Sequence, residues 1–186
     1  MKKIRRVVTG LLNGKAGIAS DVEVPEIVLA LAGGVTTVPL CGAATPPAVP
    51  NSGELAQAPK FSPPPGGYHF SVFSVPPMNE VLAAEPPADS GKAREEMERE
   101  VPGLLELMDP DVPGMHATTS IDFIVVLSGA ITLELDSGVA TVLHAGDTVI
   151  QNGVRHRWLN NGTERAWVAA VVLGTERFTQ ANLRFE

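Results

Sequence analysis

Two histidines and one carboxylate in the C-terminal third of the chain have the types and the spacing for metal or acid–base chemistry. His116 and Asp122 lie six residues apart, and His156 follows in a later apolar segment. Side chains of an extended strand alternate between its two faces, so His116 and Asp122 share a face if the segment between them is extended. Two imidazoles and one carboxylate leave positions open for substrate or oxygen on a metal such as Fe(II).

The segments that carry these residues are predicted to be short antiparallel strands. Apolar runs separated by turns that contain Gly or Asn predict strands over Ile121–Leu127, Ile131–Asp136, Val139–Leu143, Thr148–Gln151, His156–Asn160 and Ala166–Leu173. The last strand is apolar on both faces, which predicts a central place in its sheet. Many short, closely spaced strands indicate an antiparallel sandwich or barrel.

The glycines and histidines of this region resemble the paired motifs of the cupin superfamily. In the first motif, His116 and Gly129 match the family pattern, Thr118 stands where the family has a second histidine, and Asp122 stands where it has a glutamate. The positions that match the second motif are Gly146, Gly153, His156 and Asn160. The two motifs together cover about a third of the chain.

This resemblance implies an all-β fold, the double-stranded β-helix or jelly-roll barrel of the cupins. It implies that His116, Asp122 and His156 are both the metal ligands and the catalytic residues. The expected cofactor is a divalent metal ion: Fe, Mn, Zn, Ni or Co. The expected function is a metal-dependent enzyme that acts on a small organic molecule, because dioxygenation, decarboxylation, dehydration and isomerisation are all known in the superfamily.

Other side chains near the three residues are expected to form the substrate pocket. These are Thr118, Phe123, Gln151 and Trp158. An aromatic or polyketide-like molecule is one expected substrate class, because a cluster of large side chains can wall the pocket: Met115, Phe123, Trp158 and Trp167. An oxo-acid is the other substrate class considered.

Each site residue also has a structural interpretation, and the function has two alternatives. His156 can be a buried histidine bonded to a backbone carbonyl, His116 a surface-loop residue, and Asp122 an ion-pair partner of Arg155 or Arg157. The first alternative function is a metal-free barrel in which His156 and Asp122 act as acid and base, as in epimerase-like cupins. The second is a barrel that binds a small ligand without catalysis.

The first 113 residues are predicted to be a β extension that packs on the barrel of residues 114–186, so that the chain forms a single structural domain. Asn13-Gly14 between apolar runs predicts a hairpin. Tyr68–Val75 is predicted to be a strand and Gly91–Glu100 a single short helix, which Asp89 or Ser90 can cap. Beyond the helix, Leu104, Leu105 and Met108 are expected to form an apolar turn that docks on the barrel.

Composition limits the partners of the protein. The formal charge of −7 argues against nucleic acid, and the apolar stretches are too short or too interrupted to span a bilayer or to form a signal peptide. A lone cysteine, Cys41, cannot form an intramolecular disulfide, so a cytoplasmic protein is expected. A homodimer is also expected, because Ile4–Thr9 or Glu26–Leu31 can cover the open edge of a neighbour's sheet.

Overall fold

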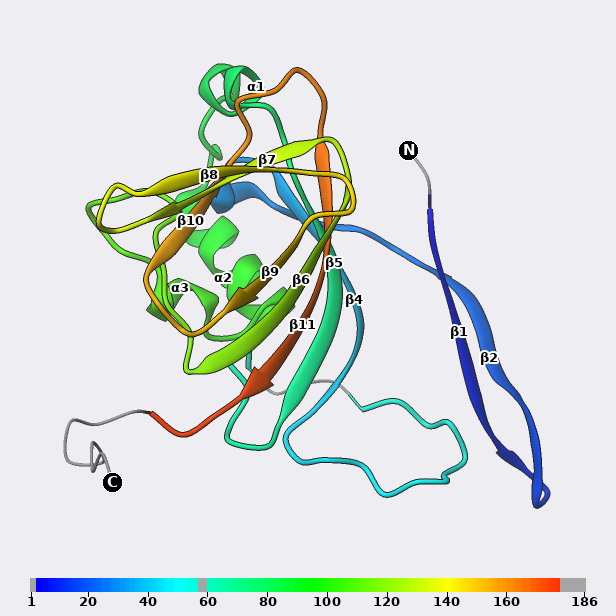
Figure 1. Ribbon diagram of the computed structural model, residues 1–186. Helices are drawn as coiled ribbons and strands as arrows, with labels where there is room; N and C mark the ends of the chain where they lie inside the picture. Colours follow the sequence, from blue (N-terminus) through cyan, green and yellow to red (C-terminus); the bar gives the residue numbers. More distant parts are fainter. Residues whose placement is uncertain (1–2, 57–59, 178–186) are drawn as a thin grey trace, which may run out of the picture.

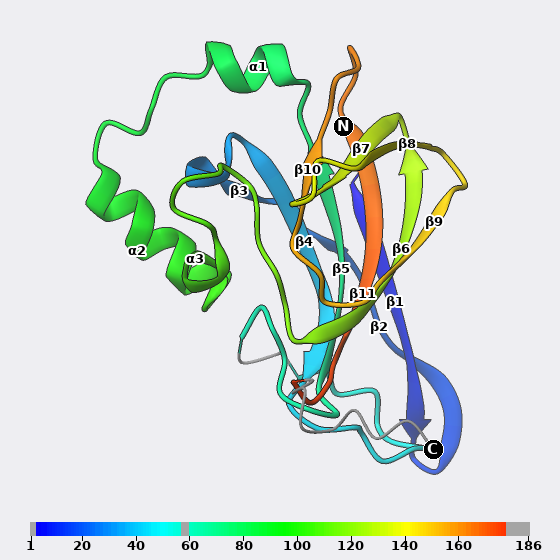
Figure 2. The same cartoon turned by 60° about the vertical axis from the view of Figure 1, so that its left-hand side comes forward.

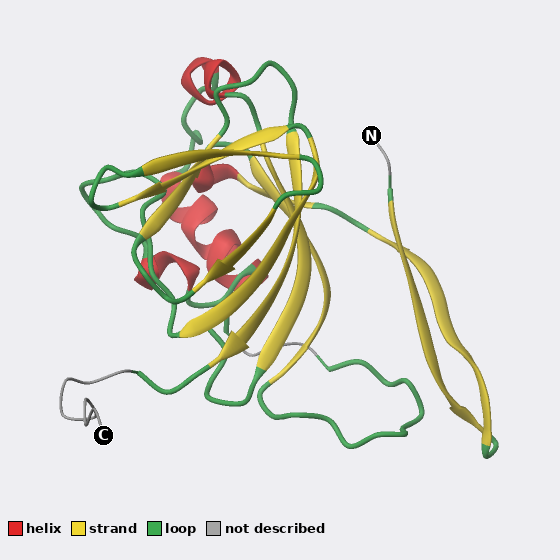
Figure 3. Ribbon diagram, in the orientation of Figure 1, coloured by secondary structure: helices red, strands yellow, loops and turns green. Residues whose placement is uncertain are grey.

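The computed structural model describes residues 3–56 and 60–177 of the chain, and strands dominate it (Figures 1 and 3). The strands are β1 (Ile4–Leu12), β2 (Lys15–Val24), β3 (Ile27–Leu29), β4 (Val35–Ala43), β5 (Tyr68–Val75), β6 (Ser120–Ser128), β7 (Ala130–Leu135), β8 (Ala140–His144), β9 (Thr148–Gln151), β10 (His156–Leu159) and β11 (Ala166–Gly174). The all-β prediction is confirmed.

Two antiparallel sheets face each other across a common core. The larger has the order β3-β4-β5-β11-β6-β9 and the smaller the order β10-β7-β8. β11 lies between β5 and β6, which agrees with its apolar sequence. Ile131 of β7 is 1% exposed and belongs to the same buried cluster as Ile124 of β6 and Val168 of β11. Burying a side chain of this size stabilises the fold by about 1.5–3 kcal/mol, so this cluster holds the two sheets together.

Strands β1 and β2 form a separate two-stranded hairpin, which we call the arm. Asn13 and Gly14 have φ values of 52° and 77°, the positive values that a tight hairpin turn requires, so the predicted turn is confirmed. Figures 1 and 2 show that the arm projects away from the barrel. Its base is anchored, because Ile4 and Val24 pack against the cluster of Val38, Leu40 and Val72 on the large sheet.

Short helices lie beside one end of the barrel (Figure 2). They are α1 (Met78–Ala83), α2 (Ser90–Glu100) and α3 (Leu104–Leu107), and a 3-10 turn covers Ala30–Ala32. α2 confirms the predicted helix, and the Asp89 carboxylate caps it by accepting a hydrogen bond of 2.9 Å from the Lys92 amide. α1 was not expected, so the prediction of a single helix was incomplete. Met97 of α2 and Leu104 of α3 pack against Leu29 of β3, which fixes the helices over the barrel.

The large sheet takes strands from both sides of residue 113, because β3, β4 and β5 precede it and β6, β9 and β11 follow it. The division of the chain into a β extension of residues 1–113 and a barrel of residues 114–186 was made from the sequence, and it stays a prediction. Within residues 3–56 and 60–177, no helix is both long and apolar enough to cross a membrane.

Candidate active site

A cavity of about 560 Å³ lies between the two sheets and beneath the helices. It is within the range of roughly 300–1,000 Å³ that is usual for small-molecule sites. Most of its wall is apolar, and the polar groups are few. The ionisable residues of the lining are His69, Asp109, His116, Asp122, His156 and Arg157. All three residues predicted to do the chemistry therefore open onto one cavity.

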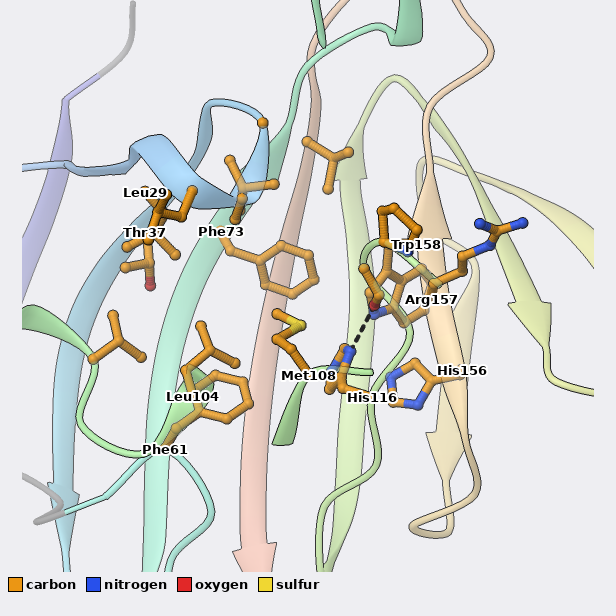
Figure 4. Close-up of a pocket in the computed structure, with 18 of the residues that line it drawn as sticks. Leu29, Thr37, Phe61, Phe73, Leu104, Met108, His116, His156, Arg157 and Trp158 are labelled. Carbon is orange, nitrogen blue, oxygen red and sulfur yellow. Dashed lines mark hydrogen bonds between the residues drawn. The ribbon is translucent and has the colours of Figure 1, made fainter. Parts of the chain in front are cut away.

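His116 and His156 lie side by side on one wall of this cavity (Figure 4). The amide of each donates a hydrogen bond of 2.9 Å to the carbonyl of the other, which forms an isolated antiparallel bridge. Directly paired residues of neighbouring strands project from the same face, so the rings meet with their centroids 4.5 Å apart. The backbone thus fixes the contact between two residues that are forty positions apart in the sequence.

Backbone carbonyls set the tautomer of both rings. His116 Nδ1 lies 3.0 Å from the Gly114 carbonyl oxygen, and His156 Nδ1 lies 2.9 Å from the Val154 carbonyl oxygen. A carbonyl oxygen only accepts, so Nδ1 carries the proton in each ring and Nε2 keeps its lone pair when the ring is neutral. The interpretation of His156 as a buried histidine bonded to a carbonyl is correct, but it does not exclude a chemical role.

Burial keeps both imidazoles neutral at physiological pH. Burial and, to a smaller extent, the charge of the neighbouring His116 lower the pKa of His156 to about 4, although the hydrogen bond to Val154 acts in the opposite direction. Burial also lowers the pKa of His116. His116 is half-buried and lines the cavity, so the interpretation as a surface-loop residue is wrong.

Asp122 enters the cavity from the large sheet. Burial raises the pKa of its carboxyl group, and the hydrogen bond from Ser120 offsets part of the increase. The Ser120 hydroxyl lies 2.5 Å from Asp122 Oδ1 and 2.7 Å from the Thr118 hydroxyl. Because one hydroxyl has a single proton, the three side chains form a hydrogen-bonded chain rather than three independent contacts. The raised pKa means that this carboxyl group takes up a proton at a higher pH than an exposed one, and in its protonated form it can donate a hydrogen bond.

Neither arginine that was considered as a partner of Asp122 contacts it. Arg157 is 2.5 Å from Glu134, and Arg155 pairs with Asp109 and, at 3.6 Å, with Asp136. The ion-pair interpretation of Asp122 is therefore wrong among the residues that the structure describes.

The predicted pocket residues fall into three groups. Trp158 lines the cavity as expected. Thr118 and Gln151 are buried beside Asp122 and do not reach the cavity wall. Phe123 is 45% exposed and lies outside the cavity, so this prediction was wrong. The physical reason is the alternation of the strand, because Phe123 must point to the face opposite that of its neighbour Asp122.

His69 is a cavity residue that was missing from the predicted site. Val172 of β11 pairs with His69 of β5 on one side and with Asp122 of β6 on the other, and Asp122 pairs in turn with Gln151 of β9. Neighbouring strands are about 4.8 Å apart, so this register places the backbones of His69 and Asp122 about 10 Å apart on the same face. Burial lowers the pKa of His69, and its Nε2 is bonded to the Phe61 carbonyl oxygen at 2.9 Å. His69 and Phe73 are an even number of residues apart in one predicted strand, so they share a face, and this spacing was the sequence signal that could have placed His69 in the cavity.

These donors do not form the three-ligand metal site that the sequence suggested. Across residues 3–56 and 60–177, no three side chains of His, Cys, Asp and Glu lie close enough together to hold one metal ion. His116 and His156 approach each other, whereas Asp122 comes from the opposite sheet and is held by Ser120. The metal-ligand assignment of these residues stays a prediction, and the donors as placed do not fit it.

The fold and the cavity define a small β-barrel protein that can enclose a ligand. Residues 104–172 match the family model of the cupin domain. This part of the chain is therefore a cupin domain, as its motifs indicated.

The curated relatives of the chain are fungal. The phomopsin biosynthesis cluster protein C' of Diaporthe leptostromiformis is 45% identical over 62 residues, which are 33% of this chain and 32% of that protein. The cupin-domain-containing oxidoreductase fogC of Aspergillus ruber is 36% identical over 52 residues, 26% of each chain. The chain thus spans about a third or less of the length of these relatives. Among solved structures, a cupin 2 conserved barrel domain protein from Salinispora arenicola CNS-205 has a TM-score of 0.40 and 19% identity, over 77% of this chain and 78% of that one.

Proposed function

We propose that this protein is an enzyme that transfers protons on a small organic molecule bound in the cavity, as isomerases and some lyases do. The observation that carries the proposal is the pair of adjacent imidazoles of His116 and His156, each with Nδ1 bonded to a carbonyl and Nε2 left to act. This function corresponds to the metal-free acid–base alternative of the sequence analysis.

The groups on the two walls have complementary roles. Nε2 of a neutral imidazole accepts a proton from a carbon atom next to a carbonyl group of the ligand. When the carboxyl group of Asp122 is protonated, a form that its burial favours by raising the pKa, it donates a hydrogen bond to the carbonyl oxygen, where negative charge develops. The imidazolium then returns the proton to a different carbon atom, or to the other face of the same one. The apolar wall excludes water, so the proton is exchanged within the site.

Deuterium exchange into an enolisable ketone tests this reaction without knowledge of the natural substrate. The probe is 2-tetralone in D₂O, followed by NMR at the carbon atoms beside the carbonyl group. The wild-type protein should accelerate the exchange, and the double variant His116→Gln/His156→Gln should abolish the acceleration because the amides cannot act as bases. His144→Gln is the matched control, since His144 is exposed on β8. Equal acceleration by both variants would contradict the proposal.

A metal-dependent oxidoreductase is the second candidate, because several fungal relatives are named cupin-domain-containing oxidoreductases. In that case His116, Asp122 and His156 would hold the ion, with Asp122 rearranged from its present contacts. Elemental analysis of protein purified without a metal-binding tag distinguishes the two candidates. Stoichiometric metal in the wild type that is lost in both His116→Ala and His156→Ala would favour the oxidoreductase.

A further inference from the structure

We propose that the cavity takes an uncharged, largely apolar ligand with a carbonyl or hydroxyl group at one end, and that it rejects anions. This inference rests on the proposed function of the same site, but it concerns which molecule binds and not what happens to it. It selects the aromatic or polyketide-like class over the oxo-acids among the substrates that the sequence left open.

The rest of the cavity lining is built from apolar side chains of the sheets and the helices. Figure 4 shows Leu29, Phe61, Phe73, Leu104 and Trp158 around one space, with Met108 between the phenylalanines and His116. Phe73 and Trp158 belong to opposite sheets, and their ring centroids are 6.3 Å apart. Aromatic side chains on two walls provide contacts for a flat, apolar ligand.

The charged side chains that line the cavity disfavour the binding of an anion. Arg157 is the one guanidinium among the described lining residues, and it is already paired with Glu134 at 2.5 Å. Figure 4 shows its guanidinium directed away from the two histidines. Asp109 is likewise engaged by Arg155. A bound carboxylate would therefore lose its hydration without gaining an unpaired cation, which is costly in an apolar site.

The polar groups match a neutral carbonyl or hydroxyl. Nε2 of His116 or His156 can accept a hydrogen bond from a ligand hydroxyl. The carboxyl group of Asp122 can donate one to a ligand carbonyl when it is protonated. A ligand with a single polar end can make these contacts, because His116, Asp122 and His156 open onto the same cavity.

Two probes with the same two-ring skeleton test the ligand class by binding alone. They are 2-tetralone, which is neutral, and 1,2,3,4-tetrahydro-2-naphthoate, which is an anion at neutral pH. The chain has two tryptophans, and Trp167 packs outside the cavity beneath the arm. Trp167→Phe thus leaves Trp158 as a fluorescent reporter inside the cavity. We expect the ketone to change the Trp158 emission and to bind roughly tenfold or more tightly than the carboxylate.

A charge variant sharpens the test. Glu134→Gln releases Arg157 from its partner and should raise the affinity for the carboxylate several-fold while the ketone affinity stays the same. Asp136→Asn is the matched control: it removes one negative charge near Arg155 and leaves Arg157 paired. Carboxylate binding as tight as ketone binding in the wild type, or no binding of either probe, would overturn the proposed ligand class. Ketone binding without deuterium exchange would leave the ligand class standing and refute the proposed reaction instead.

A second inference comes from the outer face of the large sheet. Six apolar residues of β6, β9 and β11 are exposed there, with fractions from 37% to 55%. We call them the outer patch: Phe123, Val125, Leu127, Ile150, Val171 and Leu173. Val171 pairs with Phe123, and Phe123 pairs with Ile150, so the patch is continuous across three strands. A continuous apolar surface of this kind marks a protein–protein contact.

We infer that a second copy of this chain covers the outer patch with its arm, in a twofold symmetric dimer. The arm contacts the loop of its own chain at Asn51, whose carbonyl accepts a hydrogen bond from the Leu11 amide, but it still exposes Val7, Ile18 and Val22. The base of the arm already packs on the same outer face, over β4 and β5 of its own sheet, so the surfaces are of matching character. A ribbon about 30 Å long and 10 Å wide buries about 1,200 Å² in two symmetric contacts, the lower limit for a stable interface.

Light scattering at micromolar concentration tests the dimer. The wild type should have twice the mass of one chain, 19.6 kDa. Ile150→Lys in the outer patch and Ile18→Lys in the arm should each give monomers. Val142→Lys should stay dimeric, because Val142 is an equally exposed valine on β8 of the small sheet. A monomeric wild type, or a dimer that survives Ile18→Lys, would overturn the arm-to-patch arrangement.

Discussion

Acidification should destabilise this protein through His156, and the size of the effect follows from its pKa. His156 is 2% exposed, and its pKa falls from 6.5 to about 4 on folding. At about 1.4 kcal/mol for each pH unit, this difference corresponds to about 3 kcal/mol. The folded-state pKa is the lower one, so the unfolded chain binds more protons between these values. The free energy of unfolding should therefore fall as the pH falls from about 6.5 towards about 4, and level off below.

Other buried groups also have shifted pKa values and contribute to the pH dependence, so the effect of His156 has to be isolated. His69 and His116 also have lowered pKa values and add to the slope. The raised pKa of Asp122 acts in the opposite sense, because the folded state then holds a proton more tightly than the unfolded chain. His156→Gln removes the contribution of His156 to the pH dependence of the free energy of unfolding and leaves His69, His116 and Asp122 in place.

Urea unfolding followed by circular dichroism, repeated at several pH values, provides the measurement. The free energy of unfolding of His156→Gln should depend less on pH than that of the wild type, by up to about 3 kcal/mol across the window. Replacing the exposed His144 by Gln should leave the wild-type dependence intact. Parallel curves for the wild type and His156→Gln would refute the argument that burial holds this imidazole neutral.

Three further substitutions give measurable outcomes. Thr118→His restores the second histidine of the family motif, and metal titration by calorimetry should show a higher affinity than the wild type if the predicted registration of the motif is correct. Asn160→Asp should cost about 3 kcal/mol or more in chemical denaturation, since the Asn160 amide group donates to two carbonyls that would lose their partner, whereas the exposed neighbour Asn161→Asp should change little. Ile131→Ala should cost about 2–5 kcal/mol because the side chain is 1% exposed, and Val142→Ala on the surface less than about 0.5 kcal/mol.

Local patterns predicted the elements well because each pattern has a local cause. The positive φ values of the Asn13-Gly14 turn and the Asp89 cap of α2 depend on residues within a few positions of each other. The apolar character of Ala166–Leu173 likewise predicted the central strand β11. α1 was missed because a helix of six residues is too short to show a periodic pattern.

The order of the strands in the sheets decides which residues meet in the cavity, and local sequence patterns do not predict that order. His69 joins the cavity because β11 lies between β5 and β6, a pairing between segments about fifty residues or more apart. The error at Phe123 is of a different kind. Asp122 and Phe123 are adjacent in one strand, so they could not both face the cavity, and the sequence already contained that constraint.

Thr118 and Asp122 both depart from the family pattern, and hydrogen bonds through Ser120 connect them. A histidine at this position would add a third imidazole beside Asp122, and the threonine instead ends a chain of hydroxyls that leads to the carboxyl group. That chain holds Asp122 against the large sheet, while the bridge between His116 and His156 holds the imidazoles against the small one. Donors kept apart in this way cannot surround one ion, but they lie on two sides of the same cavity. Proton transfer needs that second arrangement, with a base on one face of the ligand and a hydrogen-bond donor on the other.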